Sequence, residues 1–185
     1  MIKRLDQIIV IDVESTCWEG EAPAGQVSEI IEIGVSPLDI SSGRRLGKES
    51  IPVRPEHSTV SEFCTRLTTL TQELVERGIS FREACTLLKK KYLTKNRTWA
   101  SYGDYDRKKF EQQCRLYDVE YPFGPSHINV KNLFAIINGL PRETGMSGAL
   151  RYCNLSLEGT HHRAGDDAWN IARILSKLLQ LRQRQ

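Results

Sequence analysis

Residues 7–14, Gln-Ile-Ile-Val-Ile-Asp-Val-Glu, decide the fold that this sequence predicts. The segment is short, apolar and rich in β-branched residues, which is typical of a strand buried on both faces. Side chains alternate along a strand, so Asp12 and Glu14 share one face with Ile8 and Val10. Two carboxylates therefore extend an apolar face at the C-terminal end of the strand, the edge where open α/β sheets usually bind ligands.

The elements that follow predict an α/β fold around a mixed sheet. Strands come first along the chain, and helices then alternate with strands. Strands are expected at residues 29–38, 48–53 and 98–102, with a hairpin turn near Ser42-Gly43 and a loop over residues 118–127. Apolar residues at helical spacing predict helices at residues 81–93, 106–117 and about 165–182.

Composition indicates an ordinary globular protein, and we expect residues 1–185 to form a single domain. No run approaches the ~18 apolar residues of a membrane span, and the N-terminus lacks the pattern of a secretory signal. Five cysteines without a CxxC pair indicate reduced thiols rather than a disulfide framework or a zinc site, so a cytoplasmic location is expected. A net charge of +3 permits a nucleic-acid partner but does not require one.

Helix periodicity separates two pairs of neighbouring acids. Asp106 precedes Phe110 by four residues and so lies on the apolar face of its helix, whereas Asp104 is in register with charged residues. The same test places Asp167 on the apolar face of the last helix and Asp166 on its polar face. Acids at the start of a helix can simply complement the helix dipole. That role suits Asp104 and Asp166 but not the pair that faces the core.

Inward-facing carboxylates from three separate elements indicate a metal site, because a buried carboxylate is costly unless it is paired, protonated or bound to a cation. Oxygen ligands select Mg²⁺ or Mn²⁺, and two such ions about 3.5–4 Å apart can activate a water and stabilise the leaving oxygen of a phosphodiester. His162, five residues before Asp167, could remove the proton from that water. His161 is the competing candidate for this general base.

These residues resemble the DEDDh branch of the DEDD 3′–5′ exonuclease superfamily. That branch carries D-x-E on the first strand, an Asp before a middle helix and H-x4-D at the last helix, matched here by Asp12-Val13-Glu14, Asp106 and His162-x4-Asp167. The x4 spacing favours His162 over His161. The resemblance covers almost the whole chain. Four segments are similar to those of RNase T and Eri-type exoribonucleases: VIDVESTCWE (10–19), FCTRLTTLTQELVERGISF (63–81), GDYDRKKF (103–110) and HRAGDDAWNIARIL (162–175). A glycine common in the family is Thr69 here.

The resemblance implies an RNase H-like fold, with a mixed five-stranded sheet flanked by helices. It implies stepwise hydrolysis of single-stranded RNA or DNA from the 3′ end to 5′-mononucleotides, with RNA favoured by the Eri-type segments. The acids Asp12, Glu14, Asp106 and Asp167 would hold two Mg²⁺ or Mn²⁺ ions, and His162 would be the base. Ser15, Thr16 and Cys17 would grip the terminal nucleotide, Leu67 would wedge against its base, and Tyr105 would pack on its sugar or ring.

Several alternatives stay open on the sequence alone. A DNA-directed proofreading or repair exonuclease of the same branch would carry the same acids. A nucleic-acid-binding regulatory module without catalysis is a second alternative, although four idle carboxylates would only repel one another. Leu67 and Tyr105 could equally belong to the core. Trp18 and Trp169 have no assigned role, because each could stack on a base or pack internally.

Overall fold

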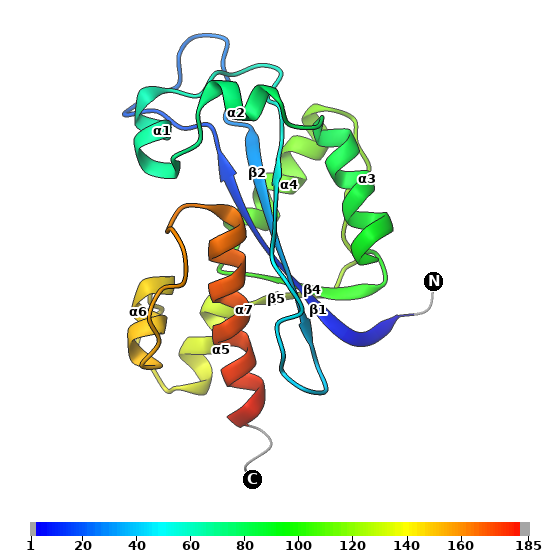
Figure 1. Ribbon diagram of the computed structural model, residues 1–185, viewed down its shortest axis with the longest axis vertical. Coiled ribbons are helices and arrows are strands. Elements are labelled where there is room, and N and C mark those ends of the chain that lie inside the picture. The colour runs from blue at the N-terminus through cyan, green and yellow to red at the C-terminus, as the bar shows by residue number, and fades with distance from the viewer. Residues whose placement is uncertain (1–2, 182–185) are drawn as a thin grey trace.

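The fold, seen in a computed structural model that describes residues 3–181, is a mixed five-stranded sheet between two groups of helices (Figure 1). The strand order is β3-β2-β1-β4-β5. The central strand β1 pairs antiparallel with β2 and parallel with β4, while β3 and β5 extend the two edges. The bounds are β1 Arg4–Ser15, β2 Ile30–Asp39, β3 Glu49–Pro52, β4 Arg97–Ser101 and β5 His127–Asn129.

Seven helices cover the sheet in the described part of the chain: α1 Glu62–Thr68, α2 Gln72–Glu76, α3 Phe81–Tyr92, α4 Tyr105–Leu116, α5 Val130–Ile137, α6 Met146–Tyr152 and α7 Ala164–Leu181. In Figure 1, α3 and α4 lie on one side of the sheet, and α5, α6 and α7 lie on the other. Within residues 3–181, none of these helices combines the length and the apolar character needed to cross a membrane.

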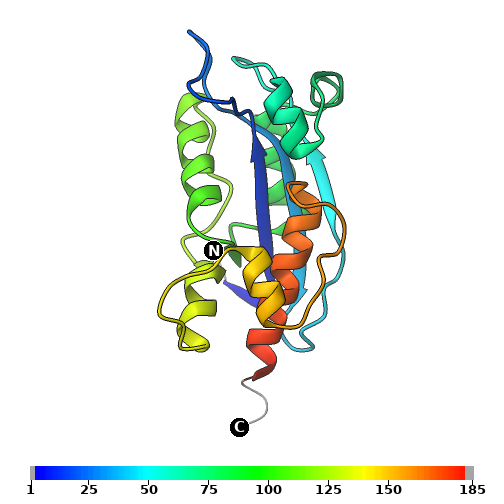
Figure 2. The same ribbon diagram turned by 90° about the vertical axis from the view of Figure 1, so that its left-hand side faces the viewer.

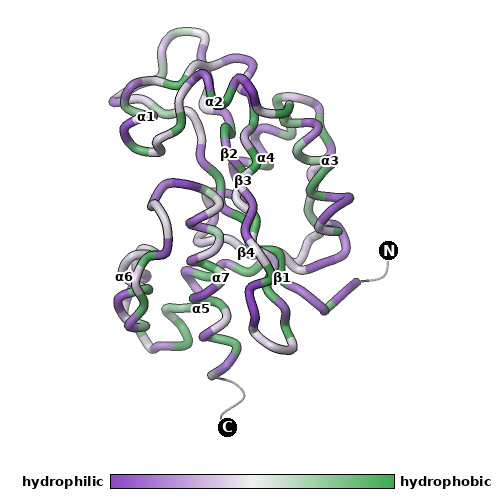
Figure 3. Tube along the Cα trace, in the orientation of Figure 1, coloured by the Kyte–Doolittle hydropathy of each residue, from purple (hydrophilic) through white to green (hydrophobic). Residues whose placement is uncertain are grey.

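Strand β1 is buried on both faces, as its sequence predicted. Ile9, Ile11 and Val13 pack in the hydrophobic cluster under α3 and α4, whereas Ile8 and Val10 pack in the cluster under α5, α6 and α7. Figure 3 shows the hydrophobic stretches running through the centre of the molecule, where the strands cross. The alternation also places Asp12 and Glu14 toward the α7 side.

The longer predicted elements are confirmed with small shifts of their ends, and the hairpin turn contains Gly43 at φ 66. The last helix was expected to reach residue 182, which lies outside the described residues. Sequence periodicity did not reveal α1, α2, α5, α6 or β5, which have three to eight residues each. Such short elements carry too few apolar repeats to show a period, and polar caps such as Ser61 and Thr71 define two of them instead. The expected loop 118–127 is correct except that His127 begins β5.

Gly34 lets the first turn of α7 approach the sheet. Gly34 pairs with Asp12 across β1 and β2, and a Cβ atom there would lie 1.8 Å from the carbonyl oxygen of Ala164. Gly165 also lies close to β3, since a Cβ on it would lie 2.3 Å from the side-chain oxygen of Ser50 and 3.2 Å from the carbonyl oxygen of Glu49. Glycine is the residue that permits such close backbone approach. The N-terminal turn of α7 is therefore pressed against the sheet opposite Asp12.

We expect Gly34→Ala to destabilise the protein by at least about 1–3 kcal/mol, the usual penalty for overpacking, because the new methyl group meets backbone atoms. Urea denaturation, read as a fall in the midpoint at constant slope, measures the change. Gly47→Ala is the matched control, since a Cβ on Gly47 has nothing within 4 Å. Equal midpoints for Gly34→Ala and the wild type would show that α7 does not need this contact.

Candidate active site

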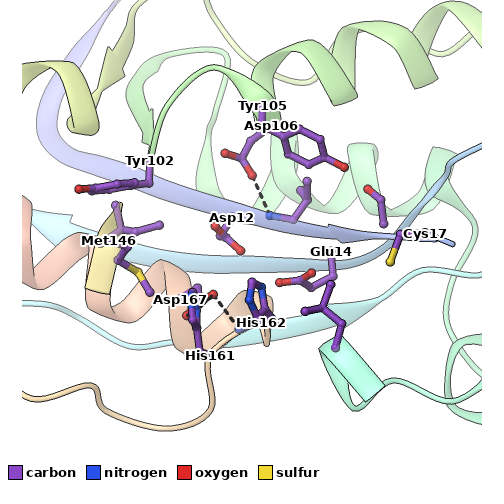
Figure 4. Close-up of a pocket in the computed structure, with 14 residues that line it drawn as sticks. Asp12, Glu14, Cys17, Tyr102, Tyr105, Asp106, Met146, His161, His162 and Asp167 are labelled. Carbon is purple, nitrogen blue, oxygen red and sulfur yellow. Dashed lines mark hydrogen bonds and ion pairs between the residues drawn. The ribbon is translucent and has the colours of Figure 1, made fainter. Parts of the chain in front are cut away.

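A pocket of about 340 Å³ lies at the C-terminal end of β1, and it brings together the four predicted acids and both candidate histidines (Figure 4). Figure 2 shows α1 in teal, α4 in green and the first turn of α7 in orange around the end of β1 in dark blue. The lining residues are Asp12, Val13, Glu14, Ser15, Cys17, Leu67, Tyr102, Tyr105, Asp106, Met146, His161, His162, Asp167 and Ile171.

Three of the acids form a compact group of oxygen ligands. Carboxylate oxygens of Asp12, Glu14 and Asp167 lie within 4.8 Å of one another, close enough to hold one cation. Glu14 is only 9% exposed and Asp167 only 4% exposed. Strand alternation supplies the first two acids, and the close approach of α7 to the sheet supplies the third.

Asp106 reaches the same pocket from α4. It is 4% exposed, and its Oδ1 accepts a hydrogen bond of 3.0 Å from the backbone N–H of Val13. The paired residues of β1 and β4 end at Val10 and Ala100, so this N–H lies beyond the ladder and needs another acceptor. The predicted register of α4 is confirmed, because the side chain of Asp104 is 44% exposed and pairs with Arg107 at 3.3 Å.

On α7 the register prediction is confirmed for both acids, because Asp167 lines the pocket and Asp166 does not, but the polar face that carries Asp166 is less exposed than expected. Asp166 forms an ion pair with Lys48 and accepts a hydrogen bond of 2.8 Å from the backbone N–H of Thr160, so it is not a freely solvated acid. Asn170, expected on the same polar face, is fully buried and donates to the carbonyl oxygen of Glu158 at 2.9 Å. The loop before α7 covers this face, which helix periodicity does not reveal.

The two histidines stack on each other with ring centroids 4.0 Å apart, but they contact Asp167 differently. The Nδ1 atom of His161 lies 2.9 Å from Asp167 Oδ2, whereas His162 uses its backbone N–H to donate to the same oxygen at 3.0 Å. Among residues 3–181, the ring of His162 makes no hydrogen bond, and His162 adopts a left-handed conformation at φ 63. Burial, helped by the neighbouring His161, lowers the pKa of His162. Its imidazole is therefore neutral near pH 7 and able to accept a proton.

The carboxylates destabilise one another when all are charged. Burial, reinforced by Asp167, raises the pKa of Glu14 to about 8. Burial also raises the pKa of Asp106 to about 7, and burial together with Asp106 raises the pKa of Asp12 well above its usual range. Burial raises the pKa of Asp167 despite the opposing contacts from His161 and His162. Cations bound among these oxygens would offset the repulsion, and an all-oxygen donor set fits Mg²⁺ or Mn²⁺.

A buried ion pair fixes the loop that carries His162. Glu32 on β2 is fully buried opposite Glu14, and Arg163 donates to its carboxylate at 2.8 and 3.2 Å. The backbone N–H of Ala164 donates to the same carboxylate at 2.8 Å. Glu32 is not among the site residues predicted from the sequence. An acid inside the apolar run of β2 was the signal that could have identified it.

The structure places four of the five predicted nucleotide contacts in the pocket: Ser15, Cys17, Leu67 and Tyr105. Leu67 is 39% exposed and Tyr105 is 57% exposed, so neither is an ordinary core residue. Thr16 is the exception, because it is fully buried outside the pocket and its Oγ1 accepts from the backbone N–H of Glu29 at 2.9 Å. Thr16 and Cys17 follow the end of β1 at Ser15, and the side chain of Thr16 is directed to the backbone of Glu29 instead of the pocket.

The two unassigned tryptophans do not line the pocket either. The indole ring of Trp169 is covered by the guanidinium of Arg45, which lies 3.7 Å from the ring centroid, and its Nε1 donates to Glu158. Two residues that the sequence reading did not select, Tyr102 and Met146, do line it.

Comparison with known proteins identifies the family. The family model described as exonuclease, RNase T, matches residues 9–175. The chain belongs to this exonuclease family. Rat 3′-5′ exoribonuclease 1 is 35% identical over an alignment that covers 95% of this chain and 53% of the rat protein. The chain thus spans about half the length of the exoribonuclease 1 relatives that it matches.

Two solved structures extend the likeness. The nuclease domain of 3′hExo, a DEDDh family member bound to rAMP, is 32% identical, with a TM-score of 0.85 and coverage of 97% of this chain and 94% of that chain. A 3′-exonuclease that recognises the 3′ end of the histone mRNA stem-loop is also 32% identical, with a TM-score of 0.83 and coverage of 95% and 82%. These likenesses place the chain in the DEDDh branch and confirm the RNase H-like α/β fold.

The raised pKa values predict how the metal-free protein responds to pH. Glu14 and Asp106 bind protons more tightly in the folded state than at their ordinary pKa values of 4.5 and 3.8, so the folded protein holds more protons between about pH 4 and 8. Stability is therefore highest at the acid end of this window and falls as the pH rises through it. In EDTA we expect the melting temperature to fall from pH 5 to pH 8, and Mn²⁺ at pH 8 to restore it.

Glu14→Gln should flatten this pH dependence, because it removes one of the buried acids. Glu21→Gln, at an exposed position outside the pocket, is the control and should melt as the wild type does. Each kcal/mol corresponds to about 2–4 °C for a protein of this size, so differential scanning calorimetry resolves the effect. A melting temperature in EDTA that rises steadily from pH 5 to pH 8 would contradict the prediction.

Proposed function

We propose that this protein is a 3′–5′ exonuclease that removes 5′-mononucleotides from single-stranded nucleic acid, with RNA preferred, and uses two divalent ions, Mg²⁺ or Mn²⁺. The observation that carries the proposal is the convergence of four inward-facing acids from β1, α4 and α7 with a histidine in one pocket. Family membership supports the reaction class, since the exonuclease family model matches residues 9–175 and the alignment with rat exoribonuclease 1 covers 95% of this chain.

Asp12, Glu14 and Asp167 together with Asp106 are the residues that would hold the ions. When bound, such ions activate a water and stabilise the leaving oxygen of a phosphodiester. The residues fit this role because oxygens of Asp12, Glu14 and Asp167 already lie close together and Asp106 lines the same pocket. Their mutual repulsion needs cations, and no nitrogen or sulfur ligand is required. Ordinary core packing explains none of these features.

His162 supplies the proton acceptor in this proposal. Its ring lines the pocket, is neutral near pH 7 and has no hydrogen-bond partner among the described residues, so a water beside the acids could transfer a proton to it. The ion pair between Glu32 and Arg163 holds the backbone next to His162, which keeps its ring over the site. His161, by contrast, is engaged with Asp167.

The shape of the pocket supports attack at a chain end. Its volume of about 340 Å³ is at the small end of the range for ligand sites, which suits one terminal nucleotide. The exposed side chains of Leu67 and Tyr105 offer apolar surface for its base and sugar, and Ser15 and Cys17 line the same side. The RNA preference is supported by the relatives, which are named exoribonucleases, by the rAMP bound to 3′hExo and by the histone mRNA stem-loop recognised by a 3′-exonuclease.

The direct test is product analysis on matched single-stranded RNA and DNA oligomers in Mn²⁺. A 5′-labelled strand should shorten in single-nucleotide steps, and a 3′-terminal label should appear at once as a 5′-mononucleotide. Asp106→Asn should abolish both signals, whereas Asp104→Asn, on the exposed side of the same turn, should stay active. Internal fragments, or activity that persists in EDTA, would exclude this mechanism. Binding without turnover in the wild type would favour the non-catalytic alternative, and faster DNA cleavage would favour the DNA-directed one.

His162→Ala should lower the single-turnover rate by about 10²–10⁴-fold, the usual contribution of a general base. His161→Ala is the matched control, and we expect a smaller loss because His161 contacts a metal-ligand candidate rather than offering a free ring. The rates of both variants, measured from pH 6 to pH 9 in Mn²⁺, decide between the two. A larger loss for His161→Ala would reassign the base to His161.

A further inference from the structure

Both histidines of the pocket lie beside Asp167, where they form a second group of candidate metal ligands (Figure 4). One ring nitrogen of His161, one of His162 and a carboxylate oxygen of Asp167 all lie within 4.8 Å of one another. The proposed exonuclease reaction uses only the ring of His162. The ring of His161 has no chemical role in that reaction, although it contacts the same acid.

The donor atoms of this second group differ from those of the first. Asp12, Glu14 and Asp167 offer only oxygen, which suits Mg²⁺ or Mn²⁺. Two imidazoles and one carboxylate suit zinc, which binds such nitrogen ligands more tightly than manganese does. Two histidines and one acid, with water as the fourth ligand, form a known type of tetrahedral zinc site.

We propose that His161, His162 and Asp167 form a zinc-binding site that switches off the exonuclease when Zn²⁺ occupies it. A ring nitrogen whose lone pair binds a metal ion cannot accept a proton, so His162 would no longer act as the general base. Asp167 would also be drawn away from the catalytic ions. The inhibitory effect rests on the proposed exonuclease function, whereas zinc binding itself does not.

The backbone brings the two neighbouring rings to the same side of the chain. In an extended segment, consecutive side chains point in opposite directions. His162 instead has φ 63, and its ring stacks on that of His161 with the ring planes only 16° apart. Such a conformation is uncommon outside glycine and persists where the surroundings fix it. The hydrogen bond from His162 N–H to Asp167 and the ion pair of Arg163 with Glu32 hold the chain on each side of this ring.

The distance from His161 to Asp167 is close to that between two ligands of one zinc ion. Zinc lies about 2.0–2.2 Å from histidine nitrogen or carboxylate oxygen, so two tetrahedral ligands are about 3.3–3.5 Å apart. The Nδ1 atom of His161 lies 2.9 and 3.2 Å from the two oxygens of Asp167. The ring of His162 has no hydrogen-bond partner among the described residues, so it can turn to supply the third ligand. The side chain of His161 is 40% exposed, which gives the ion and a water ligand access from solvent.

Zinc binding is tested with Co²⁺, which takes the same geometry as Zn²⁺ and absorbs visible light. Titration of the whole protein in excess Mg²⁺ should give the strong absorption of four-coordinate Co²⁺ without a sulfur-to-metal charge-transfer band, and Zn²⁺ should abolish it. His161→Ala should weaken Co²⁺ binding at least about 10–100-fold, since even the loss of a group behind a ligand costs that much. His57→Ala is the matched control, because His57 is exposed and lies outside the pocket.

Inhibition is measured as the Zn²⁺ concentration that halves cleavage of a single-stranded RNA oligomer in excess Mg²⁺. Each protein is compared with its own rate without zinc, so a lower starting rate of a variant does not affect the result. His161→Ala keeps His162 and should need at least about 10-fold more zinc than the wild type or His57→Ala. A zinc-selective chelator should restore the rate of the wild type.

The possible outcomes separate this inference from the proposed function. If the wild type fails to cleave in Mg²⁺ alone, the exonuclease proposal fails, and the Co²⁺ titration still tests the zinc site. Absence of four-coordinate Co²⁺ in the wild type, or equal Co²⁺ affinities in the wild type and His161→Ala, would overturn the zinc site. Equal sensitivity of their cleavage rates to zinc would overturn its inhibitory role.

Discussion

The close contact between the first turn of α7 and strand β2 is the constraint on which the site depends. Gly34 has no side chain to separate the two elements, so the backbone at Ala164 rests directly on the sheet. The carboxylate of Glu32 binds the backbone N–H of Ala164 and the guanidinium of Arg163, which ties the helix to the strand by charge as well as by packing. Because Asp167 lies in that first turn, the same contact delivers it to the acids of β1.

This contact opposes an electrostatic penalty. Asp12, Glu14, Asp106 and Asp167 are brought together where water is scarce, and burial and mutual repulsion raise their pKa values. The hydrogen bond from Val13 N–H and the contacts of His161 and His162 with Asp167 offset part of this penalty. Hydrophobic packing on both faces of β1 holds the strand rigid, so the acids cannot separate to relieve the rest. A site held in this way is preorganised to bind cations.

Particular residues show which features of the site could be predicted from the sequence. Strand alternation placed Asp12 and Glu14 on one face, and helix period chose Asp106 over Asp104, because both periods are properties of the local backbone. The same local reasoning failed where another segment covers a surface. Asn170 was expected on a polar face but is buried under the loop before α7. The expectation for Thr16 came from the family resemblance, and its side chain accepts a hydrogen bond from Glu29 outside the pocket.

The sequence by itself determined the α/β class, the strand that carries the first two acids and the faces of α4 and α7 that carry the other two. Backbone periodicity is local, so a single chain segment contains the information. Only the tertiary structure decided that Glu32 and Arg163 support the histidine loop, that His161 rather than His162 contacts Asp167 through its ring, and that Tyr102 and Met146 complete the pocket. Those features depend on how closely separate elements approach one another. The spatial distance between elements that are far apart in the chain cannot be predicted from a local sequence pattern.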